Sequence, residues 1–291
     1  MNEANQRKKL GCGDWVEVLM SKSGSNQGAF QIDPVGIEIA IHRHPGAGPE
    51  VLLIHGIGSS SADFNPVIHG MGDFCQPIAI DLRGHGASGQ PASGYRYSDY
   101  IRDLELVLAD LHMEHPIILG HSLGGIITLM WAAKNPEVPR ALIIEDSPLR
   151  SGEDFREAFE GWLQLNALPH EVAKAWYAER NPHWSPELVE QRSFDMVNTA
   201  RSAIEELQSA SLANEGLDTV GELGNIRAPL LFLRGDPESG SMVNNDDLLS
   251  LQQLLPQMHV EEFPGAGHTI HRSHPDAWLE MVQQFIEGLR D

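Results

Sequence analysis

The chain is poor in cysteine and in positive charge. Cys12 and Cys75 are the only cysteines among its 291 residues, which excludes the disulfide framework of a small secreted protein. Lysine and arginine number 20 against 41 aspartate and glutamate residues, so the formal net charge is −21. Nucleic acids and anionic membranes bind basic surfaces, and the acidic balance therefore argues against both as partners.

Targeting segments, membrane spans and metal motifs are also missing from the sequence. The first ten residues are polar and no apolar stretch follows them, so we expect no signal peptide and a cytoplasmic location. The longest apolar stretch, residues 117–133, is interrupted by His121, Ser122 and three glycines, so it is not expected to cross a bilayer. The 14 histidines form no H-E-x-x-H motif and no Cys-His cluster, so no metal site is expected.

Strand-like and helix-like patterns alternate over most of the chain, whose 41% apolar residues suffice for a large core. Short apolar runs predict buried strands, and longer amphipathic stretches predict helices. This alternation predicts an α/β protein with a parallel sheet covered by helices on both faces. Strands are expected at residues 15–20, 37–41, 51–54, 78–80, 116–119, 141–144, 230–233 and 258–263, and helices at residues 61–70, 97–111, 125–133, 245–255 and 275–289.

The alternation is interrupted between residues 150 and 224, where helical patterns occur without a strand. We therefore expect an α/β core formed by residues 1–149 and 225–291, with residues 150–224 inserted as a helical cap or lid. A cap over a site needs an apolar underside, and some aromatic side chains of this stretch are expected to supply it. They are Phe155, Phe159, Trp162, Trp176, Tyr177, Trp184 and Phe194.

One serine lies between the predicted strand 116–119 and the predicted helix 125–133, in the sequence Gly120-His121-Ser122-Leu123-Gly124. A serine between glycines on a strand-to-helix turn is typical of a nucleophile elbow, whose strained turn exposes the hydroxyl group. The Leu123 amide would then point to where the oxyanion of an attacked carbonyl forms. The pentapeptide alone is a weak signal, because a chain with 28 glycines can contain it by chance.

A serine needs a base to act as a nucleophile at neutral pH, usually a histidine oriented by a carboxylate. His268 ends a glycine-rich loop, residues 264–268, that follows a predicted strand and can turn the imidazole toward Ser122. His271 and His274 follow directly and are interpreted as local scaffold. A second glycine-bearing loop, His55-Gly56-Ile57-Gly58, follows the strand 51–54, and the Ile57 amide is the second expected oxyanion donor.

Four motifs in this order resemble the α/β-hydrolase superfamily: residues 55–58, 81–88, 120–125 and 265–268. The resemblance covers about residues 30–150 and 225–291. It implies an α/β-hydrolase fold with a mostly parallel, eight-stranded sheet, a Ser–acid–His triad in that chain order, an amide-lined oxyanion hole and no cofactor. Residues 81–88 are interpreted as a structural loop in which Arg83 pairs with Asp81.

The acid of the triad has more than one candidate. In the superfamily it usually follows the strand placed here at 230–233, often three residues after a glycine. This chain instead has Asp236 directly after Gly235, with Glu238 in the third position. Some relatives carry the acid after the strand that follows the elbow helix, and Asp146 stands there, 24 residues after Ser122. We favour Asp146 over Asp236, and place Glu238 below both.

The expected activity is that of a serine hydrolase acting on an ester, amide or carbamate bond of a small, partly apolar substrate through an acyl-enzyme. A carbon–carbon bond hydrolase or a lyase on the same triad is the alternative, because a fold does not determine a function. A ligand-binding receptor that lost turnover is the other class of function, and the presence of every triad residue type argues against it. The oligomeric state is left open, a homo-oligomer included.

Overall fold

The computed structural model describes residues 28–32, 37–148, 155–213, 215 and 220–289. The strand expected at residues 15–20 therefore lies outside the described residues. Among the described helices, none is long and apolar enough to cross a membrane.

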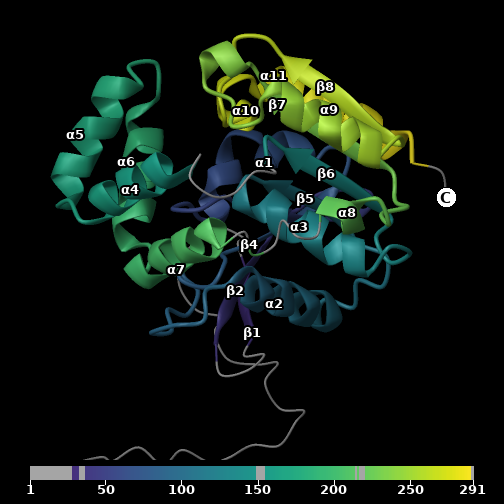
Figure 1. The fold of residues 1–291 in the computed structure, drawn as a ribbon, viewed down its shortest axis with the longest axis horizontal. Coiled ribbons are helices and arrows are strands. Elements are labelled where there is room, and N and C mark those ends of the chain that lie inside the picture. The colour runs from purple at the N-terminus through teal and green to yellow at the C-terminus, as the bar shows by residue number, and fades with distance from the viewer. Residues whose placement is uncertain (1–27, 33–36, 149–154, 214, 216–219, 290–291) are drawn as a thin grey trace, which may run out of the picture.

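A single eight-stranded sheet forms the centre of the molecule (Figure 1). Its order is β1-β2-β4-β3-β5-β6-β7-β8, with antiparallel pairing for β1–β2 and β2–β4 and parallel pairing for every other neighbouring pair. The predicted α/β-hydrolase fold with a mostly parallel sheet is confirmed. The strands are β1 Gly28–Ile32, β2 Ile39–Arg43, β3 Glu50–Ile54, β4 Gln76–Ile80, β5 Ile117–His121, β6 Ala141–Glu145, β7 Leu230–Gly235 and β8 Met258–Phe263.

The central strands are apolar on both faces because helices cover both faces. Alternate side chains of β3, such as Leu52 and Leu53, belong to two separate hydrophobic clusters. Helices α1 and α11 contribute to one cluster, and α2, α3 and α9 to the other. The bounds are α1 Asn65–Met71, α2 Tyr97–Asp110, α3 Leu123–Lys134, α9 Asn245–Leu254, α10 Ile270–Ser273 and α11 Pro275–Glu287, with 3-10 turns η1 Ser61–Phe64 and η3 Pro237–Ser239.

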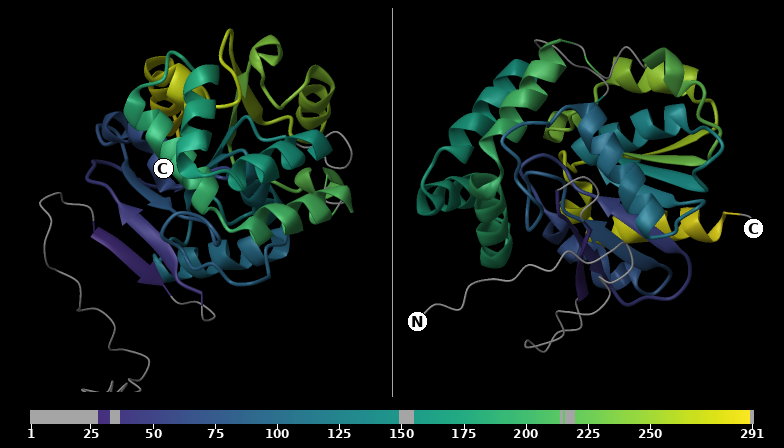
Figure 2. Two further views of the ribbon diagram at one scale, coloured as in Figure 1. Left: turned by 90° about the vertical axis from the view of Figure 1, so that its left-hand side faces the viewer. Right: turned by 90° about the horizontal axis from the view of Figure 1, so that it is seen from below.

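The described residues between β6 and β7 form helices joined by short connections, with no strand among them. Four helices, α4 to α7, stand beside the α/β core in Figure 1 and in the right-hand view of Figure 2, and they are called the α4–α7 segment below. A short fifth helix, α8 Val220–Leu223, packs against α3 of the core. The four helices are α4 Arg156–Asn166, α5 His170–Arg180, α6 Pro186–Asn198 and α7 Arg201–Leu212.

The loop after β4 differs from its prediction, because Arg83 does not pair with Asp81. Both guanidinium nitrogens Nε and Nη2 of Arg83 donate to the Asp103 carboxylate of α2, each at 2.5 Å. Asp81 instead accepts hydrogen bonds from the Ser61 and Ala87 amides at 2.6 and 2.9 Å. The physical reason is that the Asp81 carboxylate is already bonded by the Ala87 amide of its own loop and by the Ser61 amide at the start of η1, while the Arg83 side chain reaches Asp103 of α2.

Candidate active site

The candidate residues follow parallel strands at the end where each strand stops. The 55–58 loop follows β3, Ser122 follows β5, Asp146 follows β6 and Asp236 follows β7. Because these strands are parallel and neighbours in the sheet, their carboxyl ends lie at one edge, where α/β proteins place their ligands.

Ser122 occupies a strained turn between β5 and α3. Its φ of 53° and ψ of −117° are rare for a residue other than glycine, and such angles persist only where the surrounding structure enforces them. The Ser122 amide donates to the Glu145 carbonyl at 3.0 Å, which ties the turn to β6. A Cβ at Gly124 would overlap the Ile54 carbonyl, so only glycine lets α3 approach β3 this closely.

His268 and Asp146 form a hydrogen-bonded pair. His268 Nδ1 donates to Asp146 Oδ2 at 2.7 Å, and the Asp146 side chain is fully buried while that of His268 is one-quarter exposed. Burial opposes ionisation of Asp146, but the hydrogen bond and charge of His268, with donors from residues 235–242, outweigh it and lower the pKa of this carboxyl. The structure therefore brings Asp146 to the histidine predicted as the base.

The β7–α9 loop supplies the remaining donors to Asp146. The Gly235 amide lies 3.0 Å and the Ser241 hydroxyl 2.5 Å from Oδ1, and the Met242 amide lies 2.9 Å from Oδ2. Four donors thus hold one carboxylate in a single orientation, and of these four the His268 imidazole is the one that can take up and release a proton at neutral pH.

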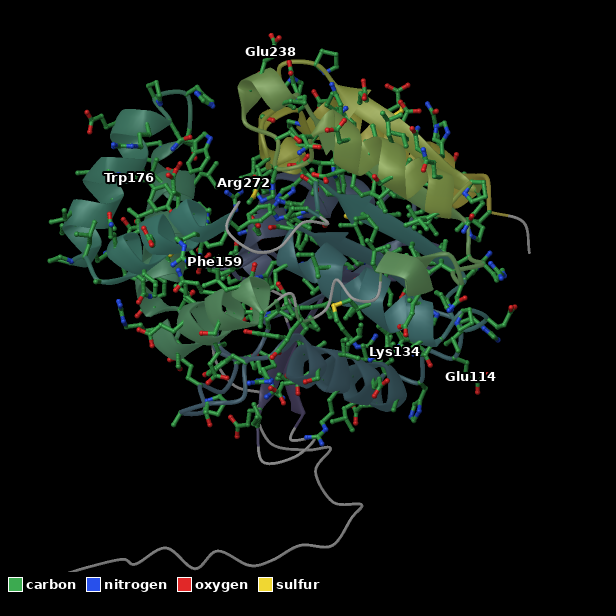
Figure 3. The ribbon with its side chains drawn as sticks, in the orientation of Figure 1. Glu114, Lys134, Phe159, Trp176, Glu238 and Arg272 are labelled. Atoms are coloured by element: carbon green, nitrogen blue, oxygen red, sulfur yellow. The ribbon has the colours of Figure 1, made fainter. Side chains whose placement is uncertain are left out.

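Asp236 and Glu238 are not brought to the His268 ring. Asp236 accepts hydrogen bonds from the Gly265 and Glu238 amides, each at 2.9 Å, and these two bonds lower its pKa. Its own amide donates to the Ala266 carbonyl at 2.7 Å, so Asp236 fastens the loop that carries His268. Glu238 is exposed and lies at the upper surface in Figure 3.

The 55–58 loop runs directly against the elbow. A Cβ at Gly56 would come within 3.0 Å of Ser122 Cβ. Burial lowers the pKa of His55 to about 4, and the neutral ring donates from Nδ1 to the Gly56 carbonyl and accepts from the Leu82 amide. Among the described residues, neither the Ile57 amide nor the Leu123 amide donates to a protein acceptor.

Ser122 opens into a narrow pocket of about 40 Å³ beneath the α4–α7 segment. The side chains that line it are apolar apart from three hydroxyl groups, those of Tyr97, Ser122 and Ser211. No charged side chain occurs among the described residues that line it. The apolar members are Ile57, Leu123, Ile126, Pro148, Phe155, Phe159, Trp162, Leu207 and Met242.

Only some of the aromatic residues expected beneath the cap reach this pocket. Phe155, Phe159 and Trp162 line it, and the last two rings meet edge to face at 5.0 Å between centroids. Figure 3 shows Phe159 toward the core and Trp176 on the outer side of the α4–α7 segment. Phe194 is 53% exposed. The aromatic residues that line the pocket belong to α4 or directly precede it, whereas Trp176 belongs to α5 and Phe194 to α6. The number of aromatic residues in the sequence does not predict this difference.

Helix α6 holds the loop that carries Ile57. Arg192 Nη1 donates to the Gly58 carbonyl at 2.7 Å, and the Ser60 hydroxyl donates to Asp195 Oδ2 at 3.0 Å. Burial raises the pKa of Asp195 to about 6, although Arg192 and the bond from Ser60 favour the ionised form. Sequence reasoning did not find these residues, nor Ser241, because they lie in no motif and meet their partners only through the fold. Within the described part of the chain, no group of three or more histidine, cysteine, aspartate or glutamate side chains could hold a metal ion.

Comparisons with known proteins agree with this architecture. A model described as the alpha/beta hydrolase family matches residues 51–281. The 2-(acetamidomethylene)succinate hydrolase of Mesorhizobium japonicum is 31% identical over 254 residues, which are 84% of this chain and 91% of that protein.

The chain belongs to the alpha/beta hydrolase family. It is an enzyme of that family, and solved structures resemble this α/β-hydrolase over most of its length. A crystal structure of E-2-(acetamidomethylene)succinate hydrolase has a TM-score of 0.76 and 27% identity, covering 90% of this chain and 100% of that one. An N-formylmaleamic acid deformylase from Pseudomonas putida has a TM-score of 0.73 and 22% identity, covering 88% and 100%, and supports the fold alone.

Proposed function

We propose that this α/β-hydrolase is a serine hydrolase with Ser122 as nucleophile, His268 as base and Asp146 as the acid that orients it. It cleaves an ester, amide or carbamate bond of a small molecule through an acyl-enzyme. The observation that carries the proposal is the 2.7 Å hydrogen bond from His268 Nδ1 to the buried carboxylate of Asp146. With Nδ1 occupied by this bond, Nε2 is the basic nitrogen of His268.

The reaction follows from these positions. Nε2 of His268 takes the Ser122 proton as Oγ attacks the substrate carbonyl, and the Ile57 and Leu123 amides donate to the oxyanion. His268 then gives the proton to the leaving group, and a water molecule activated by the same nitrogen releases the acyl group from Ser122. A general base contributes about 10²–10⁴-fold and each oxyanion donor about 10²–10³-fold to the rate.

The pocket indicates an apolar substrate group next to the scissile bond. The described residues of its lining carry hydroxyl groups and apolar side chains, whereas the relative in Mesorhizobium is named for a succinate, which bears two carboxylates. Burying an unpaired carboxylate in such a lining costs about 5 kcal/mol. We therefore propose that this enzyme prefers a short alkyl or aromatic acyl group to a succinyl group.

A fluorophosphonate probe tests the assignment of the nucleophile. We expect the wild-type enzyme to be labelled on Ser122, and Ser122→Ala to lose both labelling and turnover of p-nitrophenyl butyrate by at least about 10³-fold. Ser211→Ala is the matched control, because it removes another hydroxyl from the same pocket and should still be labelled. A wild-type enzyme that is neither labelled nor active on any ester or amide would contradict the proposal.

The substrate preference has its own test. We expect kcat/KM for p-nitrophenyl butyrate and phenylacetate to exceed that for the p-nitrophenyl monoester of succinate by about 10-fold or more. A higher kcat/KM for the succinate monoester would contradict the proposed preference and would favour a substrate like that for which the Mesorhizobium relative is named. The assignment of Ser122 as nucleophile would not be affected.

A further inference from the structure

A second set of side chains lies directly behind the candidate triad. His121 precedes Ser122, Glu145 precedes Asp146, and His271 follows His268 by three residues. His121 and Glu145 are paired across β5 and β6, and successive strand residues point to opposite faces. The three side chains are 4%, 0% and 0% exposed, so they form a buried layer under the site.

Glu145 is bonded to the segment that follows His268. Its Oε1 accepts from the amides of Ile270 and His271 at 2.7 and 3.1 Å and from His271 Nδ1 at 2.9 Å. Its Oε2 accepts from the indole of Trp278 at 3.0 Å. Burial opposes ionisation of Glu145, but the charge and hydrogen bonds of His271 outweigh it and lower the pKa of Glu145 to about 2.

His121 fastens the backbone of His268 itself. Burial lowers the pKa of His121 to about 3, so the ring is neutral and has one N–H to donate. That N–H, on Nε2, lies 3.1 Å from the His268 carbonyl oxygen. The residue before the candidate nucleophile therefore holds the main chain of the candidate base.

Asp63 connects the 55–58 loop to the buried layer formed by His121, Glu145 and His271. It lies in η1, which follows the 55–58 loop, and its carboxylate contacts the buried guanidinium of Arg272. His271 Nε2 is 3.4 Å from Asp63 Oδ1, and His121 Nδ1 is 3.7 Å from Asp63 Oδ2. Arg272, labelled in Figure 3 between α10 and the α4–α7 segment, also lies 5.5 Å from the Trp184 ring. One buried cluster thus links the four chain segments that carry Ile57, Ser122, Asp146 and His268.

We propose that Glu145 is a positioning residue for His268, acting through the Ile270 and His271 amides and the His271 imidazole. The proposal rests on the proposed function, since it concerns the same histidine. A buried ion pair can often be replaced by apolar side chains without loss of stability, so stability alone is a weak reason for this cluster. The hydrogen bonds of this cluster instead end on the main chain of residues 268–271, which positions His268 relative to Ser122.

The test replaces Glu145 by glutamine. Glu145→Gln keeps the size of the side chain but removes its charge and one of its two acceptor oxygens. With the amide nitrogen facing the His271 imidazole and the Trp278 indole, only the Ile270 and His271 amides still hold the His268 segment, through the remaining oxygen. We expect kcat for p-nitrophenyl butyrate to fall by about 10²-fold, the cost of a catalytic group displaced by ~1 Å, with KM little changed. Glu105→Gln, the same change at an exposed position of α2, is the control and should leave kcat and KM at wild-type values.

A rescue pair at His271 separates positioning from packing. In His271→Asn the amide nitrogen replaces Nδ1 and can still donate to Glu145, whereas His271→Leu removes that donor at similar size. We expect the asparagine variant to keep kcat within about 10-fold and the leucine variant to lose about 10²-fold. Circular dichroism and thermal melts show whether each variant is folded.

The outcomes are distinct. Folded Glu145→Gln and His271→Leu enzymes with wild-type kcat would overturn the positioning role while fluorophosphonate labelling of Ser122 still supported the proposed function. A wild-type enzyme that is not labelled overturns both. If neither variant folds, Glu145→Asp decides, because it keeps the charge but draws the carboxylate back by one methylene from the Ile270 and His271 donors: a lowered kcat with unchanged KM supports the proposal, and an unchanged kcat overturns it.

Discussion

Asp146 and Asp236 share a residue type and both hold the His268 loop in place, but they do so in different surroundings. Asp146 is fully buried and accepts four hydrogen bonds, one of them from the imidazole. Asp236 is half-buried and accepts from the Gly265 and Glu238 amides and from the Ser239 side chain. Partners and burial, rather than distance from a glycine in the sequence, separate the two candidates for the acid.

Replacing each aspartate by asparagine should separate their roles. Asp146→Asn puts an amide where His268 needs an acceptor and allows the wrong tautomer of the imidazole, so we expect kcat/KM to fall by about 10⁴-fold. Asp236→Asn keeps one acceptor oxygen for the Gly265 or Glu238 amide, so the loss should stay within about 10-fold. Steady-state kinetics with p-nitrophenyl butyrate measure both, and a larger loss for Asp236→Asn would contradict the assignment.

At the scale of elements, the strands β2 to β8 could be predicted, whereas β1 and several of the connections could not. A parallel strand buried on both faces must be continuously apolar, and residues 51–54, 117–119 and 230–233 show this pattern in the sequence itself. The expected helix 61–70 is divided into η1 and α1, where Pro66 stands in the first turn of α1. Strand β1, with the sequence GAFQI, contains no continuous apolar run that would predict a buried strand.

The unpredicted parts of the site depend on contacts between distant segments. Arg83 could pair with Asp81 on sequence distance alone, but the fold places Asp103 of α2 beside it. Ser241 and Asp146 are 95 residues apart and share a hydrogen bond only because β6 and β7 are neighbours. Motifs therefore predict residues whose chemistry is local, and they miss residues whose role depends on the fold.

Helix α4 is expected to limit the length of the acyl group. Trp162→Ala opens the pocket that Ser122 lines, so kcat/KM for p-nitrophenyl octanoate should rise relative to butyrate by about 10-fold or more. Trp176→Ala is the matched control, because Trp176 lies on α5 and does not line the pocket. Its ring packs against Arg180, whose Cζ lies 4.3 Å from the ring centroid. An equal change in both variants would show that the helical segment acts through its stability and not through the shape of the pocket.

At the scale of the whole molecule, the α4–α7 segment and the α/β core are joined by polar contacts at several places. The Glu206 carboxylate of α7 accepts from the Gly94 and Tyr95 amides, and the Ala200 amide donates to the Gly84 carbonyl. Asp195 of α6 differs from these contacts, because its carboxyl is buried against the loop that carries Ile57. At this junction the charge of Asp195 therefore changes in the pH range of ordinary assay buffers.

Asp195 should make the stability of the protein depend on pH. Its pKa is about 6 in the folded protein against an ordinary value near 3.8, so the folded state holds this proton more tightly than the unfolded chain. The protonated Asp195 therefore stabilises the folded state fully below about pH 4. As the pH rises through 6, this contribution to the free energy of unfolding, about 3 kcal/mol, is lost. Asp195→Asn cannot ionise, so its free energy of unfolding should exceed that of the wild type at pH 7.5 and approach it at pH 4. Urea titrations from pH 4 to 7.5 measure the difference in free energy of unfolding between the variant and the wild type, in which the contributions of the other carboxyl groups cancel.

Asp110→Asn, at an exposed position of α2, is the control, and its difference in free energy of unfolding from the wild type should not depend on pH. A difference for Asp195→Asn that is equally flat would mean that this carboxyl is not strained by burial, and that α6 holds the 55–58 loop equally well with Asp195 charged.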